Sequence, residues 1–174
     1  MSREKTHRKS LIDRVRVVDV AGVPCGAAPL FLIAGPCVIE DYDLMIKTAD
    51  ALKGIASRLD MPLIFKSSFQ KDNRSTGENY RGPGLESGLE TLARVRADFE
   101  LPVTSDIHMP SQIPSAGDVL DLLQIPAFLC MQTDLVEEAA KTGLPVNIKH
   151  GQFLAPGNMA LPVEKVRRLG NERV

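Results

Sequence analysis

The chain has 174 residues, which is long enough for one domain with a hydrophobic core. Its content of 44% hydrophobic and 25% charged residues is ordinary for a globular protein. The net charge of −1 lacks the basic excess that general nucleic-acid binding requires. We therefore expect no nucleic-acid partner.

Targeting signals and membrane spans are not evident in the sequence. The opening residues, MSREKTHRKSLIDRV, are polar and contain no apolar core of a secretory signal, and no stretch approaches the roughly 20 apolar residues of a span. The three cysteines, Cys25, Cys37 and Cys130, form neither a CxxC pair nor a disulfide framework. We expect a cytoplasmic protein with free thiols and no membrane contact.

The first elements in chain order are a tail and a hairpin. The charged residues 1–12 are expected to be disordered, and residues 13–174 to form the domain. The next segment has strand formers on both sides of a turn signal, in the order Val15, Val17, Val18, Ala21-Gly22 and Val23. This pattern predicts a short β-hairpin.

Short apolar runs then alternate with stretches of helical period. The runs are Leu30–Gly35, Pro62–Ser67, Pro102–Ile107, Val119–Ile125 and Pro145–His150. Near-continuous apolar strands separated by helices predict a parallel α/β sheet.

Four helices are predicted between and after these runs. In Asp41–Asp60 the spacing predicts that Leu52, Ile55 and Leu59 share the buried face. Gly84–Phe99 repeats the pattern with Leu85, Leu89, Leu92 and Val95 or Arg96. The other two helices are Thr133–Thr142, capped by Thr133 and ended by Gly143, and Val163–Leu169, ended by Gly170.

Polar residues concentrate where the predicted strands end. They are Cys37, Lys66, Asp106, His108, Gln124 and Lys149. Both a (β/α)8 barrel and a doubly wound sheet place their ligands at this edge, so the pattern alone leaves both architectures open. Five strands are fewer than the eight of a barrel, and residues 171–174 resemble the lead-in to another strand.

The densest polar segment follows the second run, from Phe65 to Glu86. It combines cations with hydroxyl and amide side chains, namely Lys66, Ser67, Ser68, Lys71, Asn73, Arg74, Ser75, Thr76 and Arg81. Such a loop is either a solvated basic surface or a binding site for a phosphorylated substrate. It is not a P-loop, because GxxxxGK[ST] does not occur.

Three further positions leave two interpretations each. Asp106 and His108 either face one site from a strand or serve as a helix cap and an exposed imidazole. Lys149 either extends its charge to solvent or contacts an anionic ligand. Cys37 is either a small apolar filler or a metal ligand.

Taken together, the motifs resemble those of 3-deoxy-D-manno-octulosonate 8-phosphate (KDO8P) synthases. The matching strings are IAGPCVIE, FKSSFQKDNRST, YRGPGLE, TSDIH, LLQIPAFLC, QTDL, AAKTG and NIKHGQFLAPG, in family order from about Leu30 to Val174. The KxNRS element of Lys71, Asn73, Arg74 and Ser75 separates them from DAHP synthases, which use erythrose 4-phosphate.

This resemblance implies a (β/α)8 TIM barrel whose N-terminal hairpin closes the bottom, present here as an incomplete barrel of about five parallel strands. It implies a homotetramer that condenses phosphoenolpyruvate with arabinose 5-phosphate for lipopolysaccharide biosynthesis. Lys66, Ser68 and Lys71 would face the reacting groups, and Gln124 and Lys149 would lie beside phosphoenolpyruvate. Asn73, Arg74 and Ser75 would hold the sugar phosphate, Asp106 its hydroxyls, and His108 would belong to the polar rim.

The resemblance also implies a divalent metal of unknown identity on Cys37, because the metal-dependent branch of the family has Cys at this position. Its other ligands, a His, a Glu and an Asp, belong to later strands and are not expected in this chain. Since catalytic metals need about three protein ligands, we expect the 174 residues to be catalytically incomplete.

Four positions depart from the family pattern. Met131 replaces an Arg that reaches the sugar phosphate of a neighbouring subunit, Gln70 a usual Asp, Met109 a common Glu and His150 a usual Lys. Together these departures resemble relaxed constraint. The alternative hypotheses are a non-catalytic fragment or a subunit that needs a partner chain, and a relative of DAHP or sialic acid synthases.

Overall fold

The computed structural model describes residues 16–26 and 29–174, so the tail predicted over residues 1–12 lies outside the described residues. The hairpin strands are β1 (Val18–Val20) and β2 (Val23–Cys25). Five further strands follow, β3 (Leu32–Ala34), β4 (Leu63–Lys66), β5 (Val103–Asp106), β6 (Leu122–Ile125) and β7 (Val146–Ile148). The helices are α1 (Tyr42–Arg58), α2 (Leu85–Phe99), α3 (Ile113–Val119), α4 (Thr133–Lys141) and α5 (Ala160–Arg168), with short 3-10 turns η2 (Pro110–Gln112), η3 (Ala127–Leu129) and η4 (Pro156–Met159).

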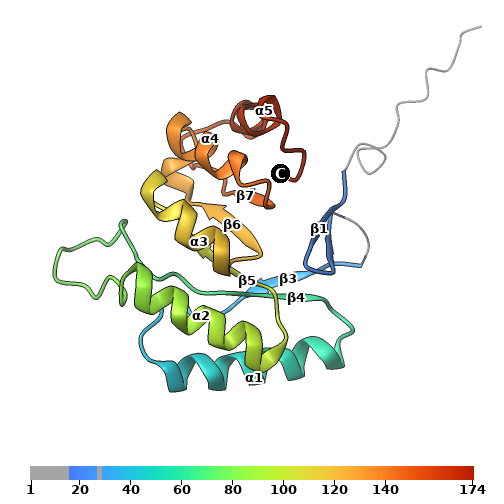
Figure 1. Cartoon of the computed structure of the whole chain (residues 1–174), viewed down its shortest axis with the longest axis vertical. Helices are drawn as coiled ribbons and strands as arrows, with labels where there is room; N and C mark the ends of the chain where they lie inside the picture. Colours follow the sequence, from blue (N-terminus) through green and yellow to red (C-terminus); the bar gives the residue numbers. More distant parts are fainter. Residues whose placement is uncertain (1–15, 27–28) are drawn as a thin grey trace, which may run out of the picture.

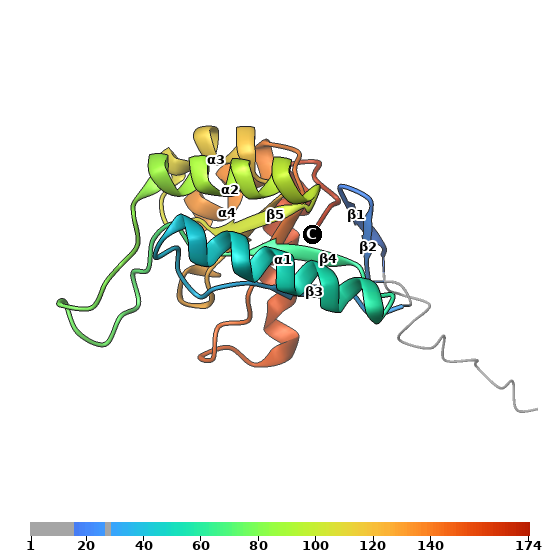
Figure 2. The same cartoon turned by 90° about the horizontal axis from the view of Figure 1, so that it is seen from below.

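The five strands β3 to β7 form one parallel sheet in sequential order, with neighbours joined by helical connections. The sheet curls, and the helices cover its outer side (Figures 1 and 2). The main core joins outward-facing strand residues such as Phe65, Val103 and Leu123 to the helices. A doubly wound sheet would bury both faces under helices. The prediction of an incomplete barrel with about five parallel strands is therefore confirmed.

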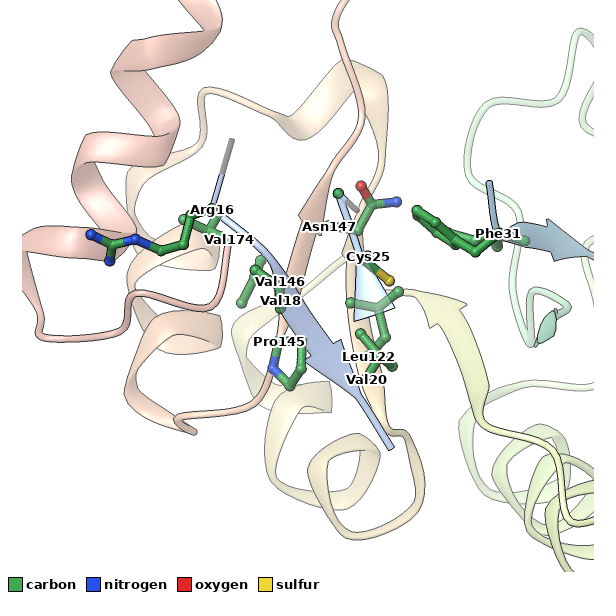
Figure 3. Close-up of a pocket in the computed structure, with 12 residues that line it drawn as sticks. Arg16, Val18, Val20, Cys25, Phe31, Leu122, Pro145, Val146, Asn147 and Val174 are labelled. Carbon is green, nitrogen blue, oxygen red and sulfur yellow. The ribbon is translucent and has the colours of Figure 1, made fainter. Parts of the chain in front are cut away.

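The hairpin covers the inner side of the sheet where the strands begin. Ala21 and Gly22 form its turn with φ of 46° and 90°. Val20 and Val23 pack on Ile64 and Leu122, which alternate with the outward-facing residues of β4 and β6. A cavity of about 210 Å³ lies beside this contact, and Figure 3 shows its lining from the hairpin, β6 and β7.

The segment 171–174 lies beside β7, where the sequence predicts the approach to a further strand. The carbonyl of Arg173 accepts a hydrogen bond from the amide of Val146 at 2.8 Å. The Arg173 guanidinium donates to the carbonyl of Asp19 at 3.0 Å, and Arg16 forms an ion pair with Glu172. These contacts tie the hairpin to the β7 edge of the sheet.

The buried face of α1 differs from the prediction. Met45, Ala49 and Ala56 are buried, whereas Ile55 and Leu59 are 41% and 63% exposed. Leu52, which completes the same spacing, is partly buried. The small alanines let the helix lie close to the sheet, and this turns the larger Ile55 and Leu59 outward.

The other helices agree more closely with the sequence. In α2 the residues Leu89, Leu92 and Val95 are buried, and Arg96 is exposed. Thr133 is the first residue of α4 and not its cap, because Gln132 occupies the cap position. Gly143 and Gly170 follow α4 and α5 with positive φ, as expected of residues that end helices. Every helix of the described ranges is too short or too polar to span a bilayer.

Two helical glycines provide a matched test of how tightly α2 packs. A Cβ on Gly88 would lie 2.2 Å from the Cβ of Phe69, whereas one on Gly54 of α1 meets only the flexible end of Arg58 at 3.7 Å. Gly54→Ala should raise the free energy of unfolding by about 1 kcal/mol, because alanine is the better helix former. Gly88→Ala should lower it by about 1–3 kcal/mol through overpacking. Urea denaturation measures both values, and equal stabilisation by the two substitutions would contradict the packing described here.

Candidate functional site

A polar rim replaces the apolar lining where the strands end. Strand residues alternate between the two faces, so Lys66 follows Ile64 and Gln124 follows Leu122 on the inner side. Pairing places Asp106 opposite Gln124, and Gln124 opposite Asn147. Period-two alternation therefore brings amide, carboxylate and ammonium groups from four neighbouring strands to one inner edge.

The carboxylate of Asp106 is the centre of this rim. It is 4% exposed and accepts hydrogen bonds from the Lys66 ammonium at 3.0 Å and the Ser68 hydroxyl at 2.6 Å. The Lys71 ammonium lies 3.4 Å away, and the Gln124 amide donates to the other carboxylate oxygen. The Gln124 carbonyl accepts from Asn147 at 2.8 Å, which extends the network to β7.

Burial and these contacts shift the pKa of both Asp106 and Lys66. Burial alone would raise the pKa of Asp106, but the Lys66 charge and the hydrogen bonds from Ser68 and Gln124 hold it well below its usual range. Burial lowers the pKa of Lys66, and the neighbouring charge of Lys71 adds to this effect, while Asp106 opposes it. The rim thus keeps a carboxylate ionised in a largely dry position.

A cavity of about 250 Å³ opens above this rim. Its lining joins the loop after β4, the end of β5, the turn after β6 and the end of β7, through Lys71, Asn73, Asp106, His108, Pro126, Ala127, Phe128, Lys149 and Gln152. The structure therefore brings five of the eleven predicted site residues together around one space. Lys66, Ser68 and Gln124 join them as the hydrogen-bond partners of Asp106.

His108 lines this cavity and has a buried ring nitrogen without a hydrogen-bond partner. Its side chain lies between Phe69 and Phe128, at ring-centroid distances of 6.4 Å and 6.2 Å. Within the described residues, its Nδ1 is the one buried side-chain polar atom without a hydrogen-bond partner. Burial lowers the pKa of His108, although Asp72 and Asp106 oppose this effect. Burial thus disfavours the charged form of this imidazole.

Lys149 supplies a cation that the described protein groups leave unmatched. Its amide donates to the carbonyl of Ile125 at 3.1 Å, which fixes its backbone after β7. Its ammonium makes no hydrogen bond or ion pair with the residues that the structure describes, whereas Lys66 and Lys71 share Asp106. Three lysines and one buried carboxylate give the cavity an excess of positive charge that favours an anionic ligand.

Two predicted site residues lie elsewhere. The Arg74 guanidinium donates to the carbonyl of Tyr80 at 3.1 Å and lines a separate hollow with Glu40 and Asn79. Ser75 is exposed on the same loop and does not line the cavity. Both follow Asn73 in the sequence, but the loop turns outward after that residue, so a shared motif did not give them a shared direction.

The residues around Cys37 do not form a metal site by themselves. Cys37 is exposed and follows β3, and it lies close enough to Lys66 to act on the pKa of that lysine, in the raising direction. Residues 16–26 and 29–174 contain no group of three or more His, Cys, Asp or Glu side chains that could hold a metal ion. A single thiolate falls short of the usual ligand set. We therefore derive no chemical step through a metal, and metal binding by Cys37 stays a prediction.

Sequence reasoning missed five residues of the site, Asn147 in the hydrogen-bond network and Pro126, Ala127, Phe128 and Gln152 in the cavity lining. Asn147 lies two positions before Lys149 and therefore on the same side of β7, because side chains alternate along a strand. This spacing could have identified Asn147 from the sequence. Phe128 and Gln152 line the cavity from turns, where no periodicity identifies them.

Three of the four departures from the family pattern have the following surroundings. The Met131 carbonyl accepts a hydrogen bond from the Lys165 ammonium at 2.9 Å, and the His150 ring contacts the carbonyl of Leu154 at 2.8 Å. The Met109 residue is 49% exposed.

The sequence of the chain is similar to those of known proteins. Residues 16–174 match the profile described as the DAHP synthetase I family. A 2-dehydro-3-deoxyphosphooctonate aldolase of Albidiferax ferrireducens is 54% identical over 145 residues, or 83% of this chain and 51% of the relative. The protein of the same name from Koribacter versatilis is 51% identical over 164 residues, or 94% of this chain and 58% of the relative. The chain spans about half the length of these curated relatives.

Replacement of Asp106 by Asn tests its central position. Asp106→Asn leaves Lys66 and Lys71 without a carboxylate, so the free energy of unfolding at pH 7 should fall by about 3–5 kcal/mol. The lowered pKa adds a pH dependence: its stabilisation is complete above about pH 3.9, the unfolded value, and is lost as the pH falls toward the folded value.

Urea denaturation from pH 7 to pH 2 measures both effects. Asp106→Asn should lack this acid-sensitive component of the free energy of unfolding. Asp50→Asn, at an exposed position on α1, is the matched control and should change stability by less than about 0.5 kcal/mol. An Asp106→Asn protein as stable as this control would contradict the assignment.

Proposed function

Because the chain belongs to the DAHP synthetase I family, we propose that it carries the substrate-binding rim of a KDO8P synthase, which condenses phosphoenolpyruvate with arabinose 5-phosphate in the cytoplasm for lipopolysaccharide biosynthesis. One observation carries the proposal: Lys66 and Lys71 pair with the ionised Asp106 at the carboxyl edge of a curled parallel sheet, and Lys149 lines the same cavity without a described partner. Two phosphorylated substrates repel each other, and such an excess of fixed cations offsets that repulsion.

In this reaction carbon 3 of phosphoenolpyruvate forms a bond to the aldehyde carbon of the sugar, whose oxygen takes a proton. Positive charge develops at carbon 2, water adds there, and phosphate leaves as the C–O bond breaks. We propose that Lys66 and Lys71 stabilise the negative charge that develops on the aldehyde oxygen. Asp106 holds their two ammonium groups close to each other. Lys149 and Gln124 are assigned to phosphoenolpyruvate.

Asp106 has two roles in this proposal. As the acceptor for Lys66, Ser68 and Gln124 it fixes the direction of these groups before the substrate arrives. As a cavity-lining carboxylate it offers an acceptor to the sugar hydroxyls. Asn73 lines the same space and is assigned to the sugar phosphate, and Arg74 and Ser75 reach that phosphate only if their loop turns inward.

We further propose that these 174 residues bind phosphoenolpyruvate without turning it over, because the described residues near Cys37 form no metal site and the five described parallel strands do not close into a barrel. In the alternative hypotheses, the chain is a non-catalytic fragment or a subunit that gains activity with a partner chain. The whole enzyme of this family is expected to act as a homotetramer.

The affinity for phosphoenolpyruvate tests the anion site. Lys149→Met should weaken binding by about 10- to 100-fold, the range expected for losing a charge-assisted contact. The fold should survive, because the Lys149 ammonium has no protein partner among the described residues. Lys141→Met removes an exposed lysine of α4 that pairs with Glu138 and is the matched control. Titration calorimetry measures all three affinities, and equal affinities for the wild-type protein and the Lys149 variant would contradict the assignment.

Phosphate release separates the three hypotheses. The chain should release no phosphate from phosphoenolpyruvate with arabinose 5-phosphate and a divalent metal, while still binding phosphoenolpyruvate. Turnover near about 1 s⁻¹ would contradict the proposed incompleteness. Activity with erythrose 4-phosphate in place of arabinose 5-phosphate would favour the DAHP synthase alternative. Activity that appears when a second chain is added, one that carries the part of the relatives not covered by these 174 residues, would favour the subunit hypothesis.

A further inference from the structure

Gln70 begins the loop that carries Lys71 and Asn73, and its side-chain amide both donates and accepts hydrogen bonds. The Gln70 Nε2 donates to the two carboxylate oxygens of Asp72 at 2.8 Å and 2.9 Å. Its Oε1 accepts from the Gln112 Nε2 at 3.4 Å. A carboxylate at position 70 would accept but could not donate, and it would repel Asp72.

On one side this amide leads to Lys71. Asp72 forms an ion pair with Arg81, and the Arg81 Nε donates to the carbonyl of Lys71 at 3.1 Å. The Lys71 amide in turn donates to the carbonyl of Arg81 at 2.7 Å. These hydrogen bonds join the start and the end of the loop at Lys71, whose ammonium lies 3.4 Å from Asp106.

On the other side the amide leads to the end of β5. Gln112 is 4% exposed, and its Oε1 accepts from the backbone amides of His108 at 2.8 Å and Met109 at 3.2 Å. The hydrogen-bonded chain from Arg81 to His108 therefore connects two walls of the cavity, the one with Lys71 and the one with His108.

We propose that Gln70 is a positioning residue that holds the Lys71 loop against the end of β5 and so sets the shape of the anion cavity. Gln70 then works as a pair with Asp72, and its departure from the family pattern is a working substitution and not relaxed constraint. The inference rests on the proposed function only where it assigns the cavity to a phosphorylated ligand.

The test exchanges the amide and the carboxylate. Gln70→Glu removes the donor and places two carboxylates side by side, whereas Gln70→Glu with Asp72→Asn returns a donor facing an acceptor and keeps the net charge of the wild type. The first measurement is the hydrogen exchange of the Lys71 amide, which needs no ligand and reports the hydrogen bonds that join the start and the end of the loop. The second is the affinity for phosphoenolpyruvate.

We expect Gln70→Glu to speed exchange at Lys71 by about tenfold and to weaken phosphoenolpyruvate binding by a similar factor. The double variant should restore both values to within about threefold of the wild type. Asp72→Asn alone should also speed hydrogen exchange at the Lys71 amide. Its effect on the affinity for phosphoenolpyruvate is less direct, because removing a negative charge by itself favours anion binding. Gln132→Glu, at an exposed position before α4, is the control and should leave the exchange at Lys71 unchanged.

Unchanged exchange in Gln70→Glu, or a double variant as loose as the single one, would overturn the inference. The melting temperature of each variant shows whether a change is local or global, and loss of the whole fold by the single variant with no recovery in the double variant also counts against it. If the wild type binds no phosphoenolpyruvate while exchange follows the expected order, the proposed function fails and the positioning role stands.

Discussion

The buried carboxylate of Asp106 is the constraint on which the rim depends. An ionised group that is 4% exposed is costly unless donors surround it, and here the donors come from β4, from the loop after it and from β6. Each donor must therefore reach the carboxylate from a fixed direction. The same hydrogen bonds that keep Asp106 charged also hold Lys66, Ser68 and Gln124 in position around it.

The inner face of the sheet has two layers, and register keeps them apart. Ile64 and Leu122 face the hairpin where the strands begin, and Lys66 and Gln124 lie two residues further along the same strands. A shift by one residue would place these polar groups under the helices and leave Phe65 on the inner side. Because one face is apolar at the base and charged at the rim, the strands accept only one register.

The sequence was sufficient for the strands and for four of the five helices, since apolar runs and turn residues mark them clearly, but it missed the short α3. It also anticipated that Lys71, Asp106, His108 and Lys149 lie around one cavity, with Lys66 paired to Asp106. It was insufficient where the decision depends on three-dimensional contacts. The buried face of α1 follows the small alanines that fit against the sheet, which a count of large apolar residues overlooks. The outward course of Arg74 is set by its bond to Tyr80, a partner that no spacing rule predicts. The partnership of Gln70 with Gln112 spans 42 positions and needed the fold.

The contacts of the three lysines differ in a way that orders their response to an anion. Lys66 is held at 3.0 Å from Asp106 and by Ser68 at 2.7 Å, so its charge is already compensated. Lys71 lies at the longer 3.4 Å, and Lys149 has no described partner. An incoming phosphate or carboxylate binds most favourably to an ammonium group that has no partner, because binding to a paired ammonium group first breaks an existing contact. In the proposed function Lys149 therefore meets the ligand first, Lys71 can turn from Asp106 toward it, and Lys66 is the last of the three to give up its contact with the carboxylate.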